Sequence, residues 1–367
     1  MRTVLNVHNL SCDSLYDGPP SISIMKDIFG SLFWYTLLMI LKSPANPVLS
    51  PIPSLWWANK KVYNTASFLK DNVYSLVFRA IGDDYISRLG MATSLDGINF
   101  EVQEVPVFEP INKYETHGCE DPRITLIDDT YWMAYTAYDG LTARIALTST
   151  KDFMSWSERY ILFPNWKEGR WVSPTQNAWN KAAAIFPEKI GNNYKLFFGD
   201  DCIWGAESED LTHWQASKKP ILAPRKGFFD SSYIEMGPPP IKTDHGWLIL
   251  YHGIDGRDDS RVYKLGAAVM DYADPSIILW RCKKPILEPS ELFEKVGMID
   301  IIDGGMQRLS KIDFVSLHEL SKQNKLPQAI FCCGAIDQGD NIQLYYSGSD
   351  TVLCLATGSV ANIMNCY

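Results

Sequence analysis

The sequence predicts an all-β protein that folds as a five-bladed β-propeller behind a short, partly helical N-terminal extension. Two motifs that recur along the chain at a spacing of roughly 60 residues carry this prediction, together with the short, β-rich segments that separate them. We expect the extension to cover residues 1–44 and the propeller to cover residues 45–367.

The first repeat is a pair of prolines that enclose two apolar residues and one variable residue. Full copies begin at Pro47, Pro106, Pro220 and Pro285, and a degenerate copy occupies residues 160–164. A unit of this length has room for four short strands, which is the content of one propeller blade. Residues 45–367 are long enough for five such units.

The second repeat is a serine, a nearby aspartate and then an aromatic residue. Its copies are Ser94, Asp96 and Phe100; Ser149, Asp152 and Trp156; and Ser208, Asp210 and Trp214. Segments rich in β-branched and aromatic residues lie between the motifs, at 73–78, 130–135, 194–198, 247–251 and 342–346. A two-sheet sandwich also contains such strands, but hairpins that recur at a near-constant period favour the propeller.

Charge and cysteine content exclude some classes of function. The 367 residues include 34 Lys or Arg and 43 Asp or Glu, for a formal net charge of −9, and no basic run stands out. We therefore expect no nucleic-acid partner. The eight cysteines form no C-x-x-C pair, so we expect no metal site and mostly buried free thiols. Free thiols favour a reducing compartment, and we expect a cytoplasmic protein.

Residues 28–41 form an uncharged apolar run within the extension. The run is shorter than the roughly 20 apolar residues of a bilayer-spanning helix. We expect a helix that packs on the main domain or at a subunit contact, with contact to a membrane surface as the alternative. The oligomeric state stays open.

Polar residues stand at or near the ends of apolar strands, about once per expected blade. In a propeller these positions converge at one end of the central channel, so we expect them to line a site. They are Asn64, Arg79, Glu120, Asp121, Arg123, Lys181, Asp200, Asp201, Glu235, His252 and Asp350. The carboxylates among them also have plainer interpretations: a turn salt bridge within 120–123, a strand-end turn at 200–201, and a solvated loop charge at 235.

Paired carboxylates are the usual machinery of glycoside cleavage. One carboxylic acid protonates the leaving oxygen, and in an inverting hydrolase a second carboxylate activates water on the opposite face of the sugar. Carboxylates that share a cleft raise one another's pKa, which keeps one of them protonated near neutral pH. The residues alone therefore indicate a propeller with a polar, carboxylate-containing channel end.

Longer motifs identify the chain as resembling glycoside hydrolase family 130, the β-mannoside phosphorylases and β-mannosidases. They run in the same order over about residues 46–356, at 118–123, 184–190, 237–241, 246–253, 263–268 and 345–350. The resemblance implies an inverting reaction with Asp121 as general acid, which in the phosphorylases acts through the 3-hydroxyl of the sugar. It also implies that Asn64, Arg79 and Asp350 hold the nonreducing mannose, and that no cofactor is needed.

The chain departs from the phosphorylases at the expected phosphate site. Lys181 and Tyr263 match family positions, but Asp200 stands where the resemblance implies an Arg and Tyr233 stands where it implies a Lys. Phosphate binding needs Arg forks and neutralising charge. Asp200 and Glu235 would repel a dianion there, whereas a carboxylate suits a base that holds water.

The sequence therefore predicts an inverting hydrolase of β-mannosides, with β-1,2-linked manno-oligosaccharides as the expected substrates, Asp121 as general acid and Glu235 as candidate base. Asp200 and Asp201 are reserve candidates for the base. Glu120, Arg123, Lys181, His252 and Tyr263 are expected to line the substrate site. The first alternative is a phosphorylase, for which inorganic phosphate is the co-substrate and mannose 1-phosphate a product. The second is an inactive sugar-binding propeller.

Overall fold

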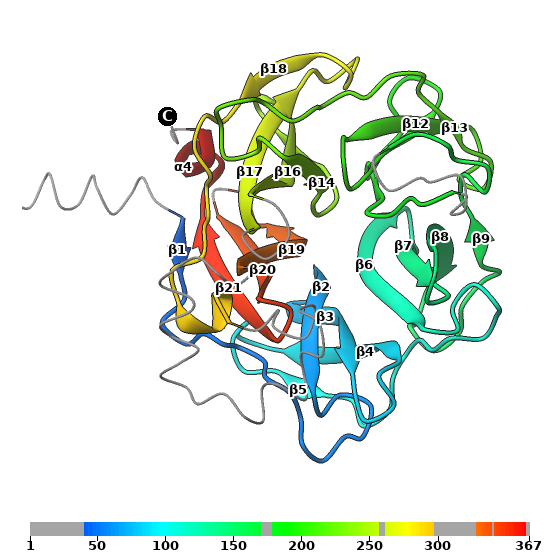
Figure 1. The fold of residues 1–367 in the computed structure, drawn as a ribbon, viewed down its shortest axis with the longest axis vertical. Helices are drawn as coiled ribbons and strands as arrows, with labels where there is room; N and C mark the ends of the chain where they lie inside the picture. Colours follow the sequence, from blue (N-terminus) through cyan, green and yellow to red (C-terminus); the bar gives the residue numbers. More distant parts are fainter. Residues whose placement is uncertain (1–39, 170–177, 257–260, 297–327, 340, 365–367) are drawn as a thin grey trace, which may run out of the picture. The chain divides into compact units, whose positions relative to one another are not determined.

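The structure is a computed structural model that describes residues 40–169, 178–256, 261–296, 328–339 and 341–364. Its strands form antiparallel four-stranded units arranged in a ring (Figure 1). The predicted five-bladed β-propeller is thereby confirmed. The extension over residues 1–39 lies outside the described residues, so its predicted helical content stays a prediction.

Each blade runs from an inner strand at the channel to a short outer strand. Blade one contains β2 (Lys61–Lys70), β3 (Val73–Ile81), β4 (Ser87–Ser94) and β5 (Glu101–Val102). Blade two contains β6 (Gly118–Ile127), β7 (Thr130–Tyr138), β8 (Ala143–Thr150) and β9 (Tyr160–Ile161). Blade three contains β10 (Ala184–Ile185), β11 (Tyr194–Phe198), β12 (Trp204–Ser208) and β13 (Gln215–Ala216).

The last two blades deviate slightly from this plan. In blade four the inner strand is divided into β14 (Tyr233–Met236) and β15 (Ile241–Thr243), followed by β16 (Gly246–Asp255), β17 (Val262–Met270) and β18 (Ile278–Arg281). Blade five contains β19 (Gln328–Asp337), β20 (Ile342–Gly348) and β21 (Val352–Gly358), and its outer strand is β1 (Leu41–Lys42). The described helices are short: the 3-10 turn η2 (Leu292–Glu294) and α4 (Val360–Met364).

Strand β1 closes the ring, because Leu41 pairs with Thr357 and Lys42 with Ala356 on β21. Blade five is thus assembled from both ends of the propeller, and its outer strand lies before residue 45. Among the described residues, no helix is long and apolar enough to cross a membrane.

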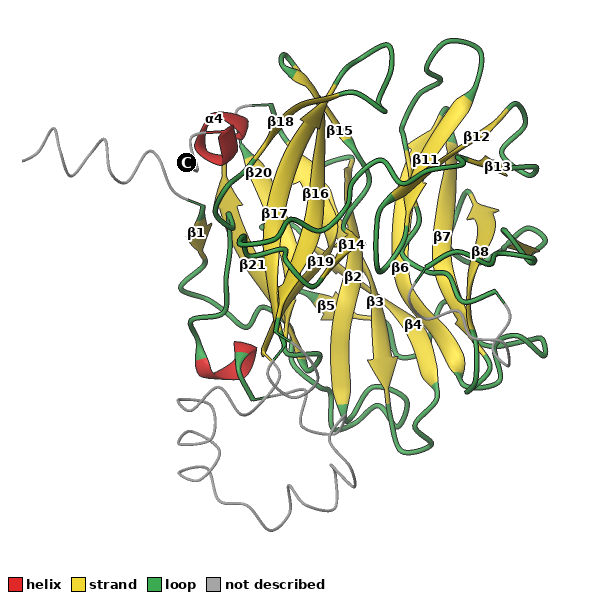
Figure 2. Ribbon diagram, turned by 45° about the horizontal axis from the view of Figure 1, so that its top comes forward, coloured by secondary structure: helices red, strands yellow, loops and turns green. Residues whose placement is uncertain are grey.

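Neighbouring blades are also linked at their inner ends. Ser87 of β4 pairs in parallel with Gly118 of β6, and Val262 of β17 pairs in parallel with Gln328 of β19. Between blades three and four, the Ile234 amide donates to the Asp201 carbonyl at 3.0 Å. The inner strands β2, β6, β14 and β19 therefore lie around the centre of the ring, as Figures 1 and 2 show.

The serine-aspartate-aromatic repeat is a turn that leaves the third strand of a blade. In blade one the Ser94 hydroxyl donates to Asp96, whose Oδ1 accepts from the amides of Ile98 and Asn99 at 2.9 and 2.8 Å. Blade three repeats this turn around Asp210. In blade two the hydroxyl belongs to Thr150, one residue after the predicted serine.

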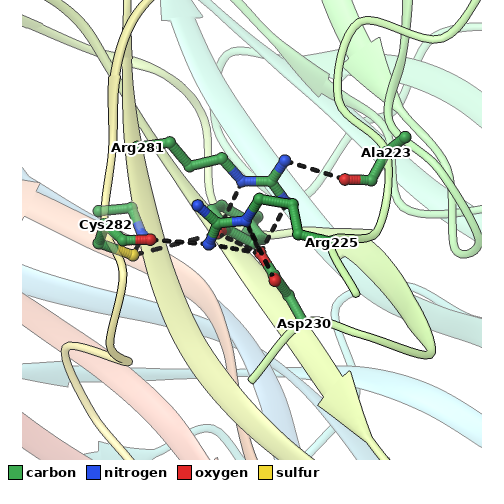
Figure 3. A network of polar contacts seen from close by, with 7 residues as sticks. Ala223, Arg225, Asp230, Arg281 and Cys282 are labelled. Atoms are coloured by element: carbon green, nitrogen blue, oxygen red, sulfur yellow. Dashed lines mark hydrogen bonds and ion pairs between the residues drawn. The ribbon is translucent and has the colours of Figure 1, made fainter. Parts of the chain in front are cut away.

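The proline repeat marks a buried contact that we call the latch. In blade four, Asp230 is fully buried and accepts from Arg225 at 2.8 Å, from Arg281 at 2.7 Å and from the Tyr251 hydroxyl at 2.8 Å (Figure 3). Arg281 also donates to the carbonyl oxygen of Ala223, the residue before the second proline of the motif.

Blades two and five contain the same latch with different residues. Glu115 accepts from Tyr135 at 2.5 Å and from Arg159 at 2.6 Å, while Arg159 also donates to the carbonyl of Glu109. In blade five the corresponding groups are Glu294, Tyr346, Lys42 and the carbonyl of Glu288. In each case the cation lies on the outer strand of the blade or directly before it. It donates to a carbonyl of the proline segment and to a buried carboxylate, which also accepts from a tyrosine hydroxyl.

Candidate active site

Two β-bulges re-aim the polar residues of blades one and two. Asn64 interrupts the pairing of β2 with φ of 44°, and Asp121 interrupts the pairing of β6 with φ of 51°. Few residues other than glycine adopt positive φ, and asparagine and aspartate tolerate it best. Bulges occur where a side chain must be turned out of the ladder. Here they bring the Asn64 amide to within 2.7 Å of Asp121 Oδ1.

Arg79 joins the two carboxylates of the predicted acid motif. It donates from Nη1 to Asp121 at 3.1 Å and from Nη2 to Glu120 at 2.6 Å. Its guanidinium lies 4.6 Å from the centre of the Tyr63 ring. The negative charge of Asp350 also helps to raise the pKa of Arg79. Charge-assisted hydrogen bonds of this kind fix geometry as well as charge. The residues that the resemblance assigns to mannose therefore lie together.

The two adjacent carboxyl groups have opposite pKa shifts. Burial alone would raise the pKa of Asp121, but Arg79, Lys181 and Arg123 lower it to about 2. Burial raises the pKa of Glu120, and the neighbouring Asp121 charge adds to this against Arg79. These directions favour the neutral form of Glu120 and the charged form of Asp121. In the free site Asp121 is ionised.

Arg123 and His252 are buried beside the site and bond to backbone groups. Arg123 is 2% exposed and donates to the carbonyls of Asp121, Met236 and Gly237 at 2.8, 3.1 and 3.2 Å. His252 has no exposed surface, accepts from the Cys332 amide at 2.8 Å and stacks on Phe331 at 3.9 Å. Burial lowers the pKa of His252 well below its usual range, so the ring is neutral. Both residues were predicted as substrate contacts, and their geometry favours positioning roles.

Lys181, Asp200 and Glu235 form the other side of the site. Lys181 Nζ lies 3.5 Å from Glu235 Oε1, and Asp200 accepts from the Trp179 indole at 2.8 Å. Burial raises the pKa of Glu235 to about 7, opposed by Lys181 and aided by Asp200. Burial also raises the pKa of Asp200, again opposed by Lys181. Lys181 stays cationic because Glu235 and Asp121 outweigh the effect of burial on its pKa.

Asp201 and Asp350 complete the predicted set. The carbonyl of Asp201 accepts from Ile234 on β14, which ties this turn to the strand that carries Glu235. Asp350 has φ of 54° in the turn after β20. In that same strand Ser347 donates from its hydroxyl to Asn64 Oδ1 at 2.8 Å. Blade five therefore meets blade one at residues that the resemblance assigns to mannose binding.

One residue of this region was missed in the sequence. Arg261 hydrogen-bonds to the hydroxyls of Tyr233 and Tyr263, which are 2.9 Å from each other. Its signal was present, because Arg261 directly precedes β17 and stands two positions before Tyr263. Only the folded pairing shows that Tyr233 lies beside them.

Among the described residues, no group of three or more His, Cys, Asp or Glu side chains could hold a metal ion. The phosphorylases of glycoside hydrolase family 130, which the chain resembles, use phosphate as a co-substrate and need no cofactor.

Comparison with known proteins identifies the family. The glycoside hydrolase family 130 model, described as β-1,4-mannooligosaccharide phosphorylase, matches residues 52–302. A 1,2-β-oligomannan phosphorylase of Thermoanaerobacter sp. (strain X514) is 36% identical over 84% of this chain and 94% of its own length. A β-1,2-mannobiose phosphorylase of Listeria innocua is 33% identical over 76% of this chain and 68% of its own length.

Solved structures show the same likeness. The structure of the Listeria innocua β-1,2-mannobiose phosphorylase with β-1,2-mannobiose has a TM-score of 0.67 and 26% identity, over 88% of this chain and 98% of the other. A structure from family 130 glycoside hydrolases that target β-1,2-mannosidic linkages in Candida mannan has a TM-score of 0.73 and 27% identity, over 88% and 94%. The chain therefore belongs to glycoside hydrolase family 130, the family of mannoside phosphorylases and related hydrolases.

Proposed function

We propose that the protein is an inverting β-mannoside phosphorylase that cleaves β-1,2-linked manno-oligosaccharides with inorganic phosphate. The observation that carries this proposal is Lys181, a partly buried cation that lies 3.5 Å from Glu235 and lowers the pKa of Asp121, on the side where we expect an anion to attack. The 33–36% identical relatives with phosphorylase activity on β-1,2-linkages support it. This reverses the order of the two mechanisms that the sequence predicted.

The reaction requires one proton from the protein. A phosphate oxygen attacks the anomeric carbon from the Lys181 side, the glycosidic C–O bond breaks, and the leaving oxygen takes a proton from Asp121, through the sugar 3-hydroxyl as the resemblance implies. The proton of the mannose 1-phosphate monoanion is then available to restore the acid. Because Asp121 is ionised in the free site, the bound sugar must raise its pKa before transfer.

Hydrolysis is the second candidate, and Glu235 favours it. Glu235 Oε1 is buried and has no hydrogen-bond partner among the described residues, although Lys181 lies 3.5 Å away. A carboxylate with a pKa of about 7 is well matched to activate water at neutral pH. In that case water replaces phosphate as the nucleophile and Glu235 takes its proton.

The two candidates differ in their need for phosphate. Purified protein is incubated with β-1,2-mannobiose in phosphate-free buffer and with added inorganic phosphate, and mannose and mannose 1-phosphate are quantified. We expect mannose 1-phosphate to form in proportion to the phosphate supplied. Release of free mannose alone, at a rate independent of phosphate, would establish hydrolysis instead. Sugar binding without turnover in either buffer would support the inactive, sugar-binding alternative.

The variant Glu235→Gln sharpens this test. Phosphorolysis requires no general base at position 235. We therefore expect phosphate-dependent turnover to persist in this variant. Under hydrolysis the loss of a general base lowers kcat by about 10²- to 10⁴-fold. β-1,4-Mannobiose serves as the linkage control, because the 1,4-specific relative is only 24% identical.

A further inference from the structure

The carboxylate of Asp121 is held at one of its two oxygens. Oδ1 accepts from the Asn64 side-chain amide at 2.7 Å and from the Arg79 guanidinium at 3.1 Å. Within the described part of the chain, no protein group donates to Oδ2. The oxygen that has no protein donor is the one that can meet a substrate hydroxyl. The two donors to Oδ1 therefore decide how the carboxylate faces the sugar.

The Asn64 donor is in turn held by Ser347, which lies on β20 in blade five. Ser347 has no exposed surface and Asn64 is 4% exposed, so their contacts lie away from solvent. The Asn64 backbone amide donates to the Ser347 hydroxyl, and the same hydroxyl donates to Asn64 Oδ1 at 2.8 Å. One serine thus binds both the backbone and the side chain of the residue that forms the β-bulge in β2.

The number of protons decides which end of the Asn64 side chain faces Asp121. A serine hydroxyl has one proton, while an asparagine side chain has an oxygen that accepts and a nitrogen that donates. Because Ser347 accepts from the backbone amide, its single proton is directed to Asn64 Oδ1. The side-chain nitrogen then points to Asp121. The reverse orientation would set two acceptor oxygens against each other, with no proton between them.

We infer that Ser347 is a positioning residue for the general acid. It fixes the Asn64 amide, the amide holds Asp121 Oδ1, and Oδ2 is left to exchange the proton with the sugar. The inference rests on the proposed role of Asp121 as acid, which phosphorolysis and hydrolysis share. It extends the catalytic machinery to β20, the strand between β19 and β21 of blade five.

The expected role of Asn64 in mannose binding offers a competing explanation for any effect of Ser347. A serine that only helped Asn64 to hold the sugar would act on the affinity for the substrate. A serine that positions the acid acts on the chemical step. The first effect appears in KM and the second in kcat.

The kinetic test compares Ser347→Ala with the wild type on β-1,2-mannobiose. Because one hydrogen bond to Asn64 is lost, we expect kcat to fall by about tenfold, while KM changes less than about twofold. Ser94→Ala is the matched control, since Ser94 is also a buried serine but donates to Asp96 in a turn of blade one. It should lower Tm and leave kcat per folded molecule unchanged. An unchanged kcat in Ser347→Ala, or a rise in KM alone, overturns the inference.

A double-mutant cycle tests whether Ser347 acts through the Asn64 side chain. Asn64→Gly removes that side chain but keeps the backbone amide, and glycine adopts the φ of 44° without strain. In this background Ser347→Ala should lower kcat by less than about twofold, because the route to Asp121 is already broken. A further loss of about tenfold would show that the two residues act independently, which contradicts the inference.

Two further measurements separate this inference from the proposed function. The assays are run with and without inorganic phosphate, since the acid is needed in either case. Phosphate-independent mannose release would refute phosphorolysis, and the kcat ratio would still decide the role of Ser347. A crystal structure of Ser347→Ala requires no turnover. We expect the Asn64 amide to turn away from Asp121 Oδ1, and a contact that stays at 2.7 Å would refute the positioning role.

Discussion

The latch of blade four and the active site both bury carboxylates among cations, but they differ in how fully each carboxylate is neutralised. In the latch, one carboxylate, Asp230, meets two arginines and a tyrosine hydroxyl. In the active site, the single guanidinium of Arg79 is shared by Glu120 and Asp121. In the latch, two arginines neutralise one carboxylate. In the active site, two carboxylates share one arginine, so neither is fully neutralised by it.

The difference separates stability from chemistry. Buried ion pairs stabilise a fold only when all their groups are satisfied, and removing one partner is costly. Strongly shifted pKa values are typical of functional sites, where buried carboxylates share too few cations. The opposite pKa shifts of Glu120 and Asp121, and the raised pKa of Glu235, mark such competition. The latches should therefore control unfolding, and the active-site carboxylates should control turnover.

The largest expected effect is on turnover in Asp121→Asn. The amide occupies the same volume and can still accept from Asn64, but it cannot transfer a proton. We expect kcat to fall by about 10³- to 10⁴-fold with little change in Tm. Steady-state assays with β-1,2-mannobiose and thermal unfolding measure the two quantities. Retained activity would remove Asp121 from the acid role and weaken the contrast with the latch.

Asp230→Asn should give the opposite pattern. The change removes the buried charge that pairs with the partly buried guanidinium groups of Arg225 and Arg281, so we expect the free energy of unfolding to fall by about 3–5 kcal/mol. Chemical denaturation measures this loss, and kcat per folded molecule should stay near the wild-type value. A variant that is fully stable but inactive would contradict the division between the two regions.

Glu235→Gln should change how stability depends on pH. The folded pKa of Glu235 is raised from 4.5 to about 7, so the native state binds its proton more tightly than the unfolded chain. Between about pH 4.5 and 7 this group makes the folded protein less stable as pH rises, by on the order of 1–3 kcal/mol. Denaturation at both pH values should show this slope in the wild type and a smaller one in the variant. Identical slopes would show that Glu235 is not strained by burial.

The smallest expected effect comes from removing one latch hydroxyl. Tyr251→Phe deletes a neutral donor to Asp230 but leaves both arginines, so we expect a loss of about 1.5 kcal/mol. Tyr135→Phe acts on Glu115, which has one arginine rather than two, and should cost more. Parallel denaturant titrations rank the two variants. The reverse ranking would show that arginine count does not set the strength of a latch.

The repeats that predicted the fold have a physical cause in the structure. The proline motifs at 106–110, 220–224 and 285–289 each present a carbonyl to a latch cation. The aspartates of the second repeat accept two turn amides each. Local chemistry of this kind is legible in the chain, because the residues that form a turn are neighbours in sequence. The repeat does not predict a further turn around Asp271, because no serine and no aromatic residue accompanies this aspartate in the order of the motif.

By itself, the sequence determined the propeller class, the family and most residues of the candidate site, because strand pattern, turn chemistry and long motifs are properties of contiguous residues. Tertiary structure alone decided how the charges compete. It placed Arg79 between the carboxylates of Glu120 and Asp121. It also placed Lys181 at 3.5 Å from Glu235 and Tyr233 beside Arg261. The balance between water and phosphate depends on those distances, since burial and Coulomb energy act through space rather than along the chain.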